Sequence, residues 1–234
     1  MMGYLGSKAA SGAYQKIISL MPVHDTYVET HLGGGAIMLR KPPAALNIGF
    51  DIDVNTIEAF CQGNPDFLDG LADDLMISAS DAVTELNQLA YGELGKVLIY
   101  ADPPYLAETR TSNAKYRNEY TRADHVQLLQ CLRRVPANVM LSGYPSALYD
   151  EMLPDWHTTE FQVMTRGGVR TEKLWMNYDP AVVPLFSSAF AGDDYEDRRR
   201  IKRKAARWRE KFRLLAPGER LAVLAALSEV DLNR

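Results

Sequence analysis

The residues of this sequence best suited to chemistry are Asp102-Pro103-Pro104-Tyr105, which directly follow the apolar segment 97–101. That segment is rich in β-branched and aromatic residues and begins shortly after Gly95, so we predict a buried parallel strand there. The two prolines lack backbone N–H groups and fix φ, which ends the strand. A carboxylate, a carbonyl and an aromatic ring are thus expected at the carboxyl end of a strand, where open α/β sheets bind ligands.

An isolated Asp-Pro or Pro-Pro pair most often marks a turn. Here the tetrapeptide closes a strong strand, and it resembles the catalytic motif of amino-group methyltransferases that act on nucleobases. The resemblance implies that Asp102 and the Pro103 carbonyl accept the N–H bonds of an exocyclic amino group and stabilise its developing positive charge. It also implies that Tyr105 stacks on a base taken out of its helix. No covalent nucleophile is expected for this chemistry.

A second motif lies upstream, where a predicted strand over 26–29 runs into Thr30-His31-Leu32-Gly33-Gly34-Gly35 and a helix predicted over 36–40. Glycines let a ligand approach the backbone, and a helix N-terminus offers free N–H groups, an arrangement typical of nucleotide binding. The dinucleotide fingerprint G-x-G-x-x-G is excluded because Met38 occupies the place of its third glycine. We expect His31 to contribute its backbone more than its imidazole.

Acidic residues follow two further predicted strands. Asp51 ends the strand predicted over 46–51, where an acid can bind both hydroxyls of a ribose. Asp53 is better explained as the cap of the helix that follows. Asp81 comes after a short strand predicted over 75–78, and it either caps the next helix or meets a ligand at the sheet edge. Of these two roles we favour the ligand.

The remaining apolar periodicity completes an α/β chain with a helical end. The polar segment 106–121 follows the catalytic motif, so it is either a loop over the site that contacts nucleic acid or a solvated loop. Further helices are predicted over 11–20, 54–61, 82–90, 123–134, 145–153, 196–215 and 219–230, and further strands over 138–143, 156–165 and 173–178, the last two joined through Gly167-Gly168.

The net charge of −4 conceals a strong asymmetry. Residues 198–213 contain ten Lys/Arg and one acid, a balance of +9, whereas residues 1–197 contain 14 Lys/Arg and 26 Asp/Glu, a balance of −12. A basic segment beside an acidic body is either a contact for a polyanion or a solvated helix face. The candidate nucleic-acid contacts are Lys8, Arg110, Lys115, Tyr116, Arg117, Arg199, Arg203 and Arg207.

Composition sets the outer bounds of the prediction. A chain of 234 residues can hold one substantial core with a small appendage, and its 47% hydrophobic and 24% charged content is ordinary for a globular protein. The sequence shows no signal-peptide pattern and no apolar run long enough to span a bilayer, so we expect a cytoplasmic protein. Cys61 and Cys131 are expected to be reduced, with neither a disulfide nor a metal site.

The order and spacing of these motifs over about residues 3–180 resemble the DNA adenine N6-methyltransferases whose cofactor motif precedes the catalytic motif, in a short, phage-type form of the Dam-like group. The resemblance implies S-adenosyl-L-methionine as cofactor and DNA, double-stranded first, as partner. It also implies that the final strand falls within Glu172 to Asp179. The implied cofactor contacts are Tyr4, Gly6, Lys8, Glu29, His31, Gly33, Gly34, Gly35, Asp51, Ile52, Asp81 and Asp102.

The sequence departs from the family in two places. Thr30 and His31 replace the usual Pro and Phe of the cofactor loop, and only about thirty positions separate Asp51 from Asp81, which leaves no room for the usual target-recognition domain.

We therefore expect a Rossmann-like methyltransferase fold, α/β, with a mostly parallel seven-stranded sheet and helices on both faces. The catalytic domain would span 1–185 and a basic helical extension 186–234. An RNA adenine methyltransferase and a silent regulatory binding protein are the alternatives, and the extension could mediate a dimer.

Overall fold

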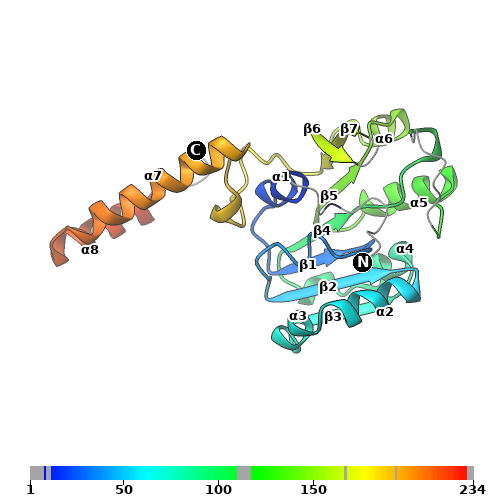
Figure 1. The fold of residues 1–234 in the computed structure, drawn as a ribbon, viewed down its shortest axis with the longest axis horizontal. Coiled ribbons are helices and arrows are strands. Elements are labelled where there is room, and N and C mark those ends of the chain that lie inside the picture. Colours follow the sequence, from blue (N-terminus) through cyan, green and yellow to red (C-terminus); the bar gives the residue numbers. More distant parts are fainter. Residues whose placement is uncertain (1–7, 9–11, 110–116, 166–167, 193, 231–234) are drawn as a thin grey trace.

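The computed structural model describes residues 8, 12–109, 117–165, 168–192 and 194–230. A seven-stranded sheet in the order β3-β2-β1-β4-β5-β7-β6 forms its body (Figure 1). Only β7 runs antiparallel to the others, so the expected mostly parallel sheet is confirmed. The strands are β1 (Thr26–Glu29), β2 (Leu46–Asp51), β3 (Leu75–Ala79), β4 (Val97–Ala101), β5 (Asn138–Gly143), β6 (His157–Thr165) and β7 (Gly168–Met176).

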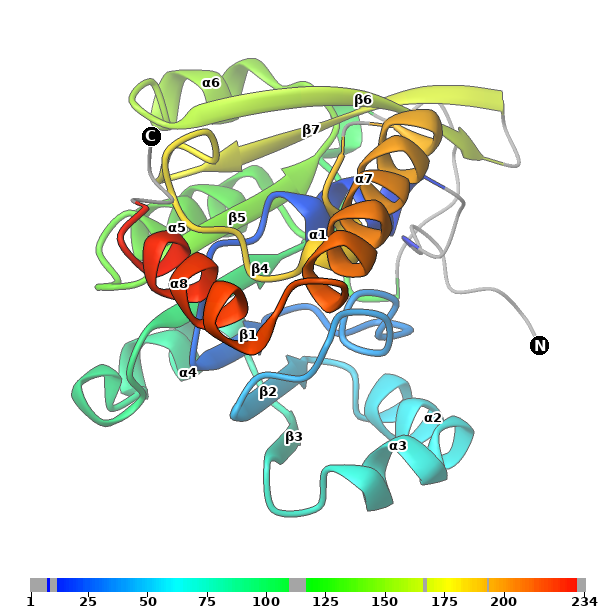
Figure 2. The ribbon, with the colours of Figure 1, turned by 90° about the vertical axis from the view of Figure 1, so that its left-hand side faces the viewer.

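Helices cover both faces of this sheet, as expected for the fold class (Figure 2). Side chains of β4 alternate between two apolar clusters, one that packs under α4, α5 and α6 and one that packs under α1 and α2. The helices are α1 (Ala13–Ser19), α2 (Val54–Gly63), α3 (Pro65–Gly70), α4 (Ala82–Gln88), α5 (Arg122–Leu132), α6 (Ala147–Met152), α7 (Tyr195–Arg213) and α8 (Pro217–Ser228), with short 3₁₀ turns at Tyr91–Glu93, Ala107–Thr109 and Ser188–Phe190.

The helix predicted over 36–40 is wrong, because these residues form consecutive turns. The backbone N–H of Leu39 donates to Gly35 O at 2.9 Å, but no helix continues from it. Gly33 and Gly35 adopt positive φ of 52° and 61°, which lies outside helical geometry. Pro42 follows two residues after position 40, and a segment this short between glycines and a proline cannot recover the cost of helix nucleation.

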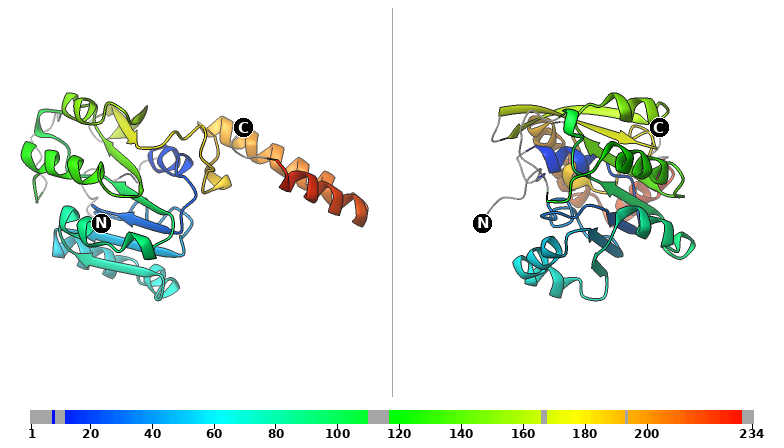
Figure 3. Two further views of the ribbon diagram at one scale, coloured as in Figure 1. Left: turned by 180° about the vertical axis from the view of Figure 1, so that it is seen from behind. Right: turned by 90° about the vertical axis from the view of Figure 1, so that its right-hand side faces the viewer.

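The C-terminal helices α7 and α8 lie apart from this body and extend away from it (Figures 1 and 3). Neither helix has a buried residue, and even Trp208 is 62% exposed. The preceding segment does pack on the body, since the Phe186 ring stacks on His24 with centroids 4.0 Å apart. We propose that the extension begins after Phe190 and not after 185.

Within the described part of the chain, no helix combines the length and apolarity needed to cross a membrane.

Candidate active site

The carboxyl ends of β1, β2 and β4 meet at one edge of the sheet. The parallel register places Glu29 opposite Gly49 of β2 and Tyr100 of β4. The backbone N–H of Thr30 donates to Tyr100 O at 3.1 Å, which ties the glycine turn to the strand that carries the Asp-Pro-Pro-Tyr motif. The strand order reverses between β1 and β4, and α/β sheets bind their ligands at such a switch point.

Asp102 follows β4 at this edge, and its carboxylate is held from two sides. Lys8 Nζ donates to Oδ1 at 2.7 Å, and Ser142 Oγ of β5 donates to the same oxygen at 2.8 Å. Ser142 Oγ also lies 2.9 Å from the hydroxyl of Tyr100, which fixes its own position. Among the described residues, no hydrogen bond reaches Oδ2 of Asp102, so this oxygen is the one that can accept an N–H from a ligand.

Tyr105 is buried in an aromatic and charged environment. Lys8 Nζ donates a hydrogen bond to its hydroxyl, which in turn donates to Glu172 Oε1 at 2.9 Å. The Tyr144 ring lies 4.3 Å from the Tyr105 ring, tilted by 43°, and Lys8 Nζ lies 4.8 Å from the Tyr105 ring centre. A base that stacks on Tyr105 would therefore share this cluster with Tyr144.

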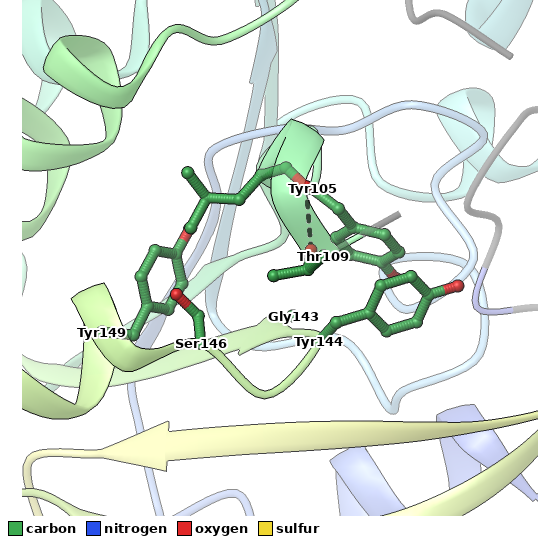
Figure 4. A pocket seen from close by; sticks show the side chains of 7 residues that line it. Tyr105, Thr109, Gly143, Tyr144, Ser146 and Tyr149 are labelled. Carbon is green, nitrogen blue, oxygen red and sulfur yellow. Dashed lines mark hydrogen bonds between the residues drawn. The ribbon is translucent and has the colours of Figure 1, made fainter. Parts of the chain in front are cut away.

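A small pocket opens beside the Tyr105 ring (Figure 4). Tyr105 and Tyr144 lie on one side of it and Tyr149 on the other, with Ser146 between them. The hydroxyl oxygen of Ser146 is buried and has no hydrogen-bond partner in the described part of the chain. The pocket thus offers aromatic surface and one polar atom next to the Asp-Pro-Pro-Tyr motif. Its lining residues are Tyr105, Leu106, Thr109, Gly143, Tyr144, Ser146 and Tyr149.

The charge balance of this site centres on Lys8, which is only 4% exposed. Burial alone would lower the pKa of Lys8, but the carboxylates of Asp102 and Glu172 outweigh it and raise the pKa above its ordinary value. Burial raises the pKa of Glu172, an effect that Lys8 opposes. Lys8 is therefore protonated and buried, and it pairs with Asp102 and Tyr105 inside the protein. Its ammonium points at Asp102 and Tyr105, and a contact with phosphate remains only a prediction.

The glycine turn is braced from inside the protein by Glu29. Its Oε2 accepts hydrogen bonds from Tyr27 OH and from the backbone N–H of Met38, both at 2.9 Å. Burial raises the pKa of Glu29 to about 8. At Gly35 a Cβ atom would lie 2.2 Å from Cε2 of Phe60, so the turn requires glycine there. Glu29 and Gly35 fix the shape of the turn, while Gly34 at its tip is exposed.

Asp51 holds the same turn from β2. Its Oδ2 accepts the backbone N–H of Gly33 at 2.9 Å, and its Oδ1 accepts the backbone N–H of Asp53 at 3.0 Å. Burial raises the pKa of Asp51. Each carboxylate oxygen can accept a second hydrogen bond, so Asp51 retains acceptor capacity. The neighbouring Ile52 is 52% exposed and presents apolar surface at the sheet edge.

The other two acids cap helices. Asp53 accepts the backbone N–H of Asn55 at 3.0 Å at the start of α2, as predicted. Asp81 accepts the backbone N–H of Thr84 at 2.8 Å at the start of α4. This is the role that we favoured less for Asp81. The cap occupies Oδ2, and contact of the carboxylate with a cofactor remains a prediction.

His31 engages more than its backbone. Its Nδ1 lies 2.7 Å from Thr30 Oγ1, and its Nε2 lies 3.0 Å from Tyr120 OH. Burial lowers the pKa of His31 to about 3, so the imidazole is neutral. The ring therefore links the glycine turn to the segment that precedes α5. That His31 contributes its backbone more than its imidazole to a ligand stays a prediction.

The predicted nucleic-acid contacts fall in two separate places. Arg199, Arg203 and Arg207 are exposed and spaced by four residues along one face of α7, away from the sheet edge (Figure 1). Arg117 Nη1 instead pairs with Asp53 Oδ2 at 2.5 Å, two residues after Asp51. The remaining predicted site residues, Tyr4, Gly6, Arg110, Lys115 and Tyr116, lie outside the described residues.

Three residues of the site escaped the sequence reasoning as functional candidates. Ser142 and Tyr144 stand at the carboxyl end of β5, which pairs directly with β4, so the rule that neighbouring strand ends meet could have found them. Glu172 is a buried acid in the antiparallel strand β7. An acid in an otherwise half-buried strand is the signal that could have singled it out.

The sequence matches no protein-family model, and no curated protein is significantly similar to it. Three of the solved structures that are partly similar to it are the following. Spermidine synthase from Thermotoga maritima has 12% identity and a TM-score of 0.49, and the match covers 73% of this chain and 61% of the synthase chain. A provisionally assigned rRNA methylase from Clostridium thermocellum has 12% identity and a TM-score of 0.47, and the match covers 74% of this chain and 98% of the methylase chain. Precorrin 8w decarboxylase from Methanobacterium thermoautotrophicum has 11% identity and a TM-score of 0.47, and the match covers 70% of this chain and 86% of the decarboxylase chain.

Identities and TM-scores this low assign neither a reaction nor a substrate to this chain. The strand order of the sheet, its single antiparallel strand β7 and the helices on both faces define a Rossmann-like, doubly wound α/β fold. Reaction and substrate have to be argued from the residues at the switch point.

Proposed function

We propose that this protein is an S-adenosyl-L-methionine-dependent methyltransferase that acts on the exocyclic N6 amino group of an adenine extruded from DNA. The observation that carries the proposal is the placement of Asp102. Its Oδ1 is fixed by Lys8 and Ser142, its Oδ2 faces no hydrogen-bond partner among the described residues, and the glycine turn lies on the adjacent strand.

The residues of the sheet edge fit the cofactor. Asp51 has acceptor capacity left for ribose hydroxyls, and Ile52 presents an apolar surface on which a nucleobase can pack. The backbone of the glycine turn can be approached closely, and Asp81 would meet the cofactor's adenine amino group. When bound, the cofactor supplies an electrophilic methyl group on a sulfonium that leaves as a neutral thioether.

The chain's own groups act on the target base. The Oδ2 atom of Asp102 and the Pro103 carbonyl would accept the two N–H bonds of the amino group, which favours a tetrahedral nitrogen with a free lone pair. These acceptors would also stabilise the positive charge that develops on nitrogen, and Asp102 would accept the departing proton. Tyr105 and Tyr144 would stack with the base, because their rings already form one cluster beside the pocket.

Contact with DNA would come from a different part of the chain. Arg199, Arg203 and Arg207 on the exposed face of α7 suit phosphate groups, which position a protein without specifying sequence. No target-recognition domain separates Asp51 from Asp81. We therefore propose short or relaxed sequence preference, limited mainly by the bases that flank the target adenine.

The experiment that tests this function is incubation with methyl-labelled cofactor and, in parallel, duplex DNA, single-stranded DNA and RNA, followed by nucleoside analysis. N6-methyladenine in DNA is the expected product. Label in RNA alone would replace DNA with RNA as the substrate. Cofactor binding without transfer to any of the three polymers would instead support a silent regulatory protein.

A further inference from the structure

Glu172 contributes a second carboxylate to the interior of the site, and the reaction steps described above do not use it. It lies on β7 and is 3% exposed. Its Oε1 accepts the hydroxyl of Tyr105 at 2.9 Å. Its Oε2 is buried 3.6 Å from Lys8 Nζ and has no hydrogen-bond partner in the described part of the chain. A buried carboxylate is costly, so its retention in this position calls for a compensating role.

The charges around Lys8 suggest that role. Lys8 Nζ lies 2.7 Å from Asp102 and 3.6 Å from Glu172, so two carboxylates share one ammonium and the ionised cluster carries a net charge of −1. Without Glu172 the cluster would carry no net charge. The Lys8 ammonium would then lie beside the Asp102 carboxylate, which receives the substrate, with no second negative charge to offset it. The proposed reaction brings a cationic sulfonium and a developing ammonium to this same place. In a low-dielectric interior, one unit of net charge on this cluster would change the stability of both positive groups strongly.

Resting on the proposed function, we propose that Glu172 is a positioning residue that offsets the charge of Lys8, so that Asp102 keeps its full strength as an acceptor for the reacting amino group. Lys8 fixes the orientation of Asp102 and Tyr105, and Glu172 cancels the electrostatic cost of placing a cation there. The simpler alternative is that Glu172 only holds the hydroxyl of Tyr105 in place.

The substitution Glu172→Gln separates these two roles. Glutamine keeps the size of the side chain and an oxygen that can accept the Tyr105 hydroxyl, but it removes the negative charge. We expect kcat to fall about tenfold or more, with KM for DNA and the melting temperature nearly unchanged. The ratio of the Kd for S-adenosylmethionine to the Kd for the uncharged S-adenosylhomocysteine should rise several-fold, because only the sulfonium senses the lost charge. Glu160→Gln, in the exposed part of the neighbouring strand β6, is the matched control.

A double variant completes the test. If Glu172 acts through the charge of Lys8, then Glu172→Gln should change kcat by less than about twofold in a Lys8→Met background, because the effect of one partner disappears when the other is absent. Glu172→Asp should retain part of the activity that Glu172→Gln loses. A wild-type kcat and ligand ratio in Glu172→Gln would overturn the proposal, and so would a loss that persists undiminished without Lys8.

The ligand ratio also keeps this inference distinct from the proposed function. If the wild-type protein methylates none of the polymers, the proposed function fails, yet the ratio still shows whether Glu172 offsets a cation next to the sulfonium. If the wild-type protein is active and the ratio and kcat of Glu172→Gln are normal, only the role of Glu172 fails.

Discussion

The α/β body and the helical extension differ in burial and in where their charged residues lie. In the body β1, β2 and β4, which end at the candidate site, are almost wholly buried, and polar groups such as Lys8, Glu29 and Glu172 are enclosed with partners. In α7 and α8 no residue is buried, and ten Lys/Arg occupy residues 198–213. The body therefore depends on packing and internal charge pairs, whereas the extension keeps its charge in solvent.

On the proposed function, this difference would separate catalysis in the body from DNA binding in the extension. A rigid interior can orient a carboxylate to within the tolerance that catalysis requires, and such precision needs packed neighbours. Attraction to phosphate needs only accessible positive charge, which an isolated helix supplies. Substitutions in the two regions should accordingly affect different measurements.

The largest contrast is expected in stability, between one tryptophan of each region. Trp175 is fully buried in β7, where Asp150 also accepts the hydrogen bond of its indole, so Trp175→Ala should lower the free energy of unfolding by about 3–5 kcal/mol. Trp208→Ala in α7 should change it by no more than about 0.5 kcal/mol. Chemical denaturation followed by circular dichroism measures both. A large loss for Trp208→Ala would show that the extension docks on the body or on a second copy.

The next contrast concerns the cofactor acids. Asp51→Ala removes an acceptor at the sheet edge and should weaken cofactor binding by roughly 1–3 kcal/mol. Asp81→Ser removes the carboxylate but preserves a capping hydroxyl for α4, so its effect on affinity would report ligand contact and not helix stability. Asp194→Ala, at the cap of α7, is the control in the extension and should leave the affinity unchanged. Calorimetry that finds unchanged affinity in both body variants would refute the placement of the cofactor.

A smaller and more specific effect is expected for the extension. Truncation after residue 190 should weaken DNA binding and flatten its salt dependence, because each phosphate contact contributes about 0.9 to the slope of log K against log salt. Loss of the contacts of Arg199, Arg203 and Arg207 would lower the slope by roughly 2–3. Binding measured by fluorescence anisotropy between low and moderate salt gives this slope directly.

The smallest expected effect of that truncation is on sequence preference, since phosphate contacts position a protein but do not read bases. Sequencing of methylated random DNA should give the same flanking-base preference with and without the extension. A strict motif of four or more fixed bases would reveal a recognition element that we have overlooked. A change in oligomeric state with an unaltered salt slope would assign the helices to association between copies instead.

Much of the fold could be predicted from local patterns. Apolar runs such as 97–101 and 138–143 identified the central strands, and Asp53 was correctly predicted to cap its helix. The helix predicted over 36–40 failed because the backbone of Gly33 and Gly35 takes positive φ, which composition alone does not reveal. The strand β7 begins at Gly168, earlier than predicted, because its pairing with β6 extends beyond the apolar part of the sequence.

The site was predictable in its motifs but not in its contacts. Lys8 and Asp102 are 94 residues apart, and Tyr105 and Glu172 are 67 residues apart, so only the folded sheet brings them together. Sequence patterns could place Lys8 near a cofactor or a phosphate, yet its burial between two carboxylates depends on how β7 packs beside β5. For the same reason Ser142 could not be assigned before the pairing of β4 with β5 was known.

The most direct test of the account is the separation of binding from chemistry in Asp102→Ala. Labelled methyl transfer to DNA and cofactor affinity should be measured on the same preparation, with Asp66→Ala, an exposed acid of α3, as the control. The account predicts that transfer is lost, by about 2.7 kcal/mol of transition-state stabilisation or more, while the cofactor still binds. Near-normal turnover by a folded Asp102→Ala protein would contradict it.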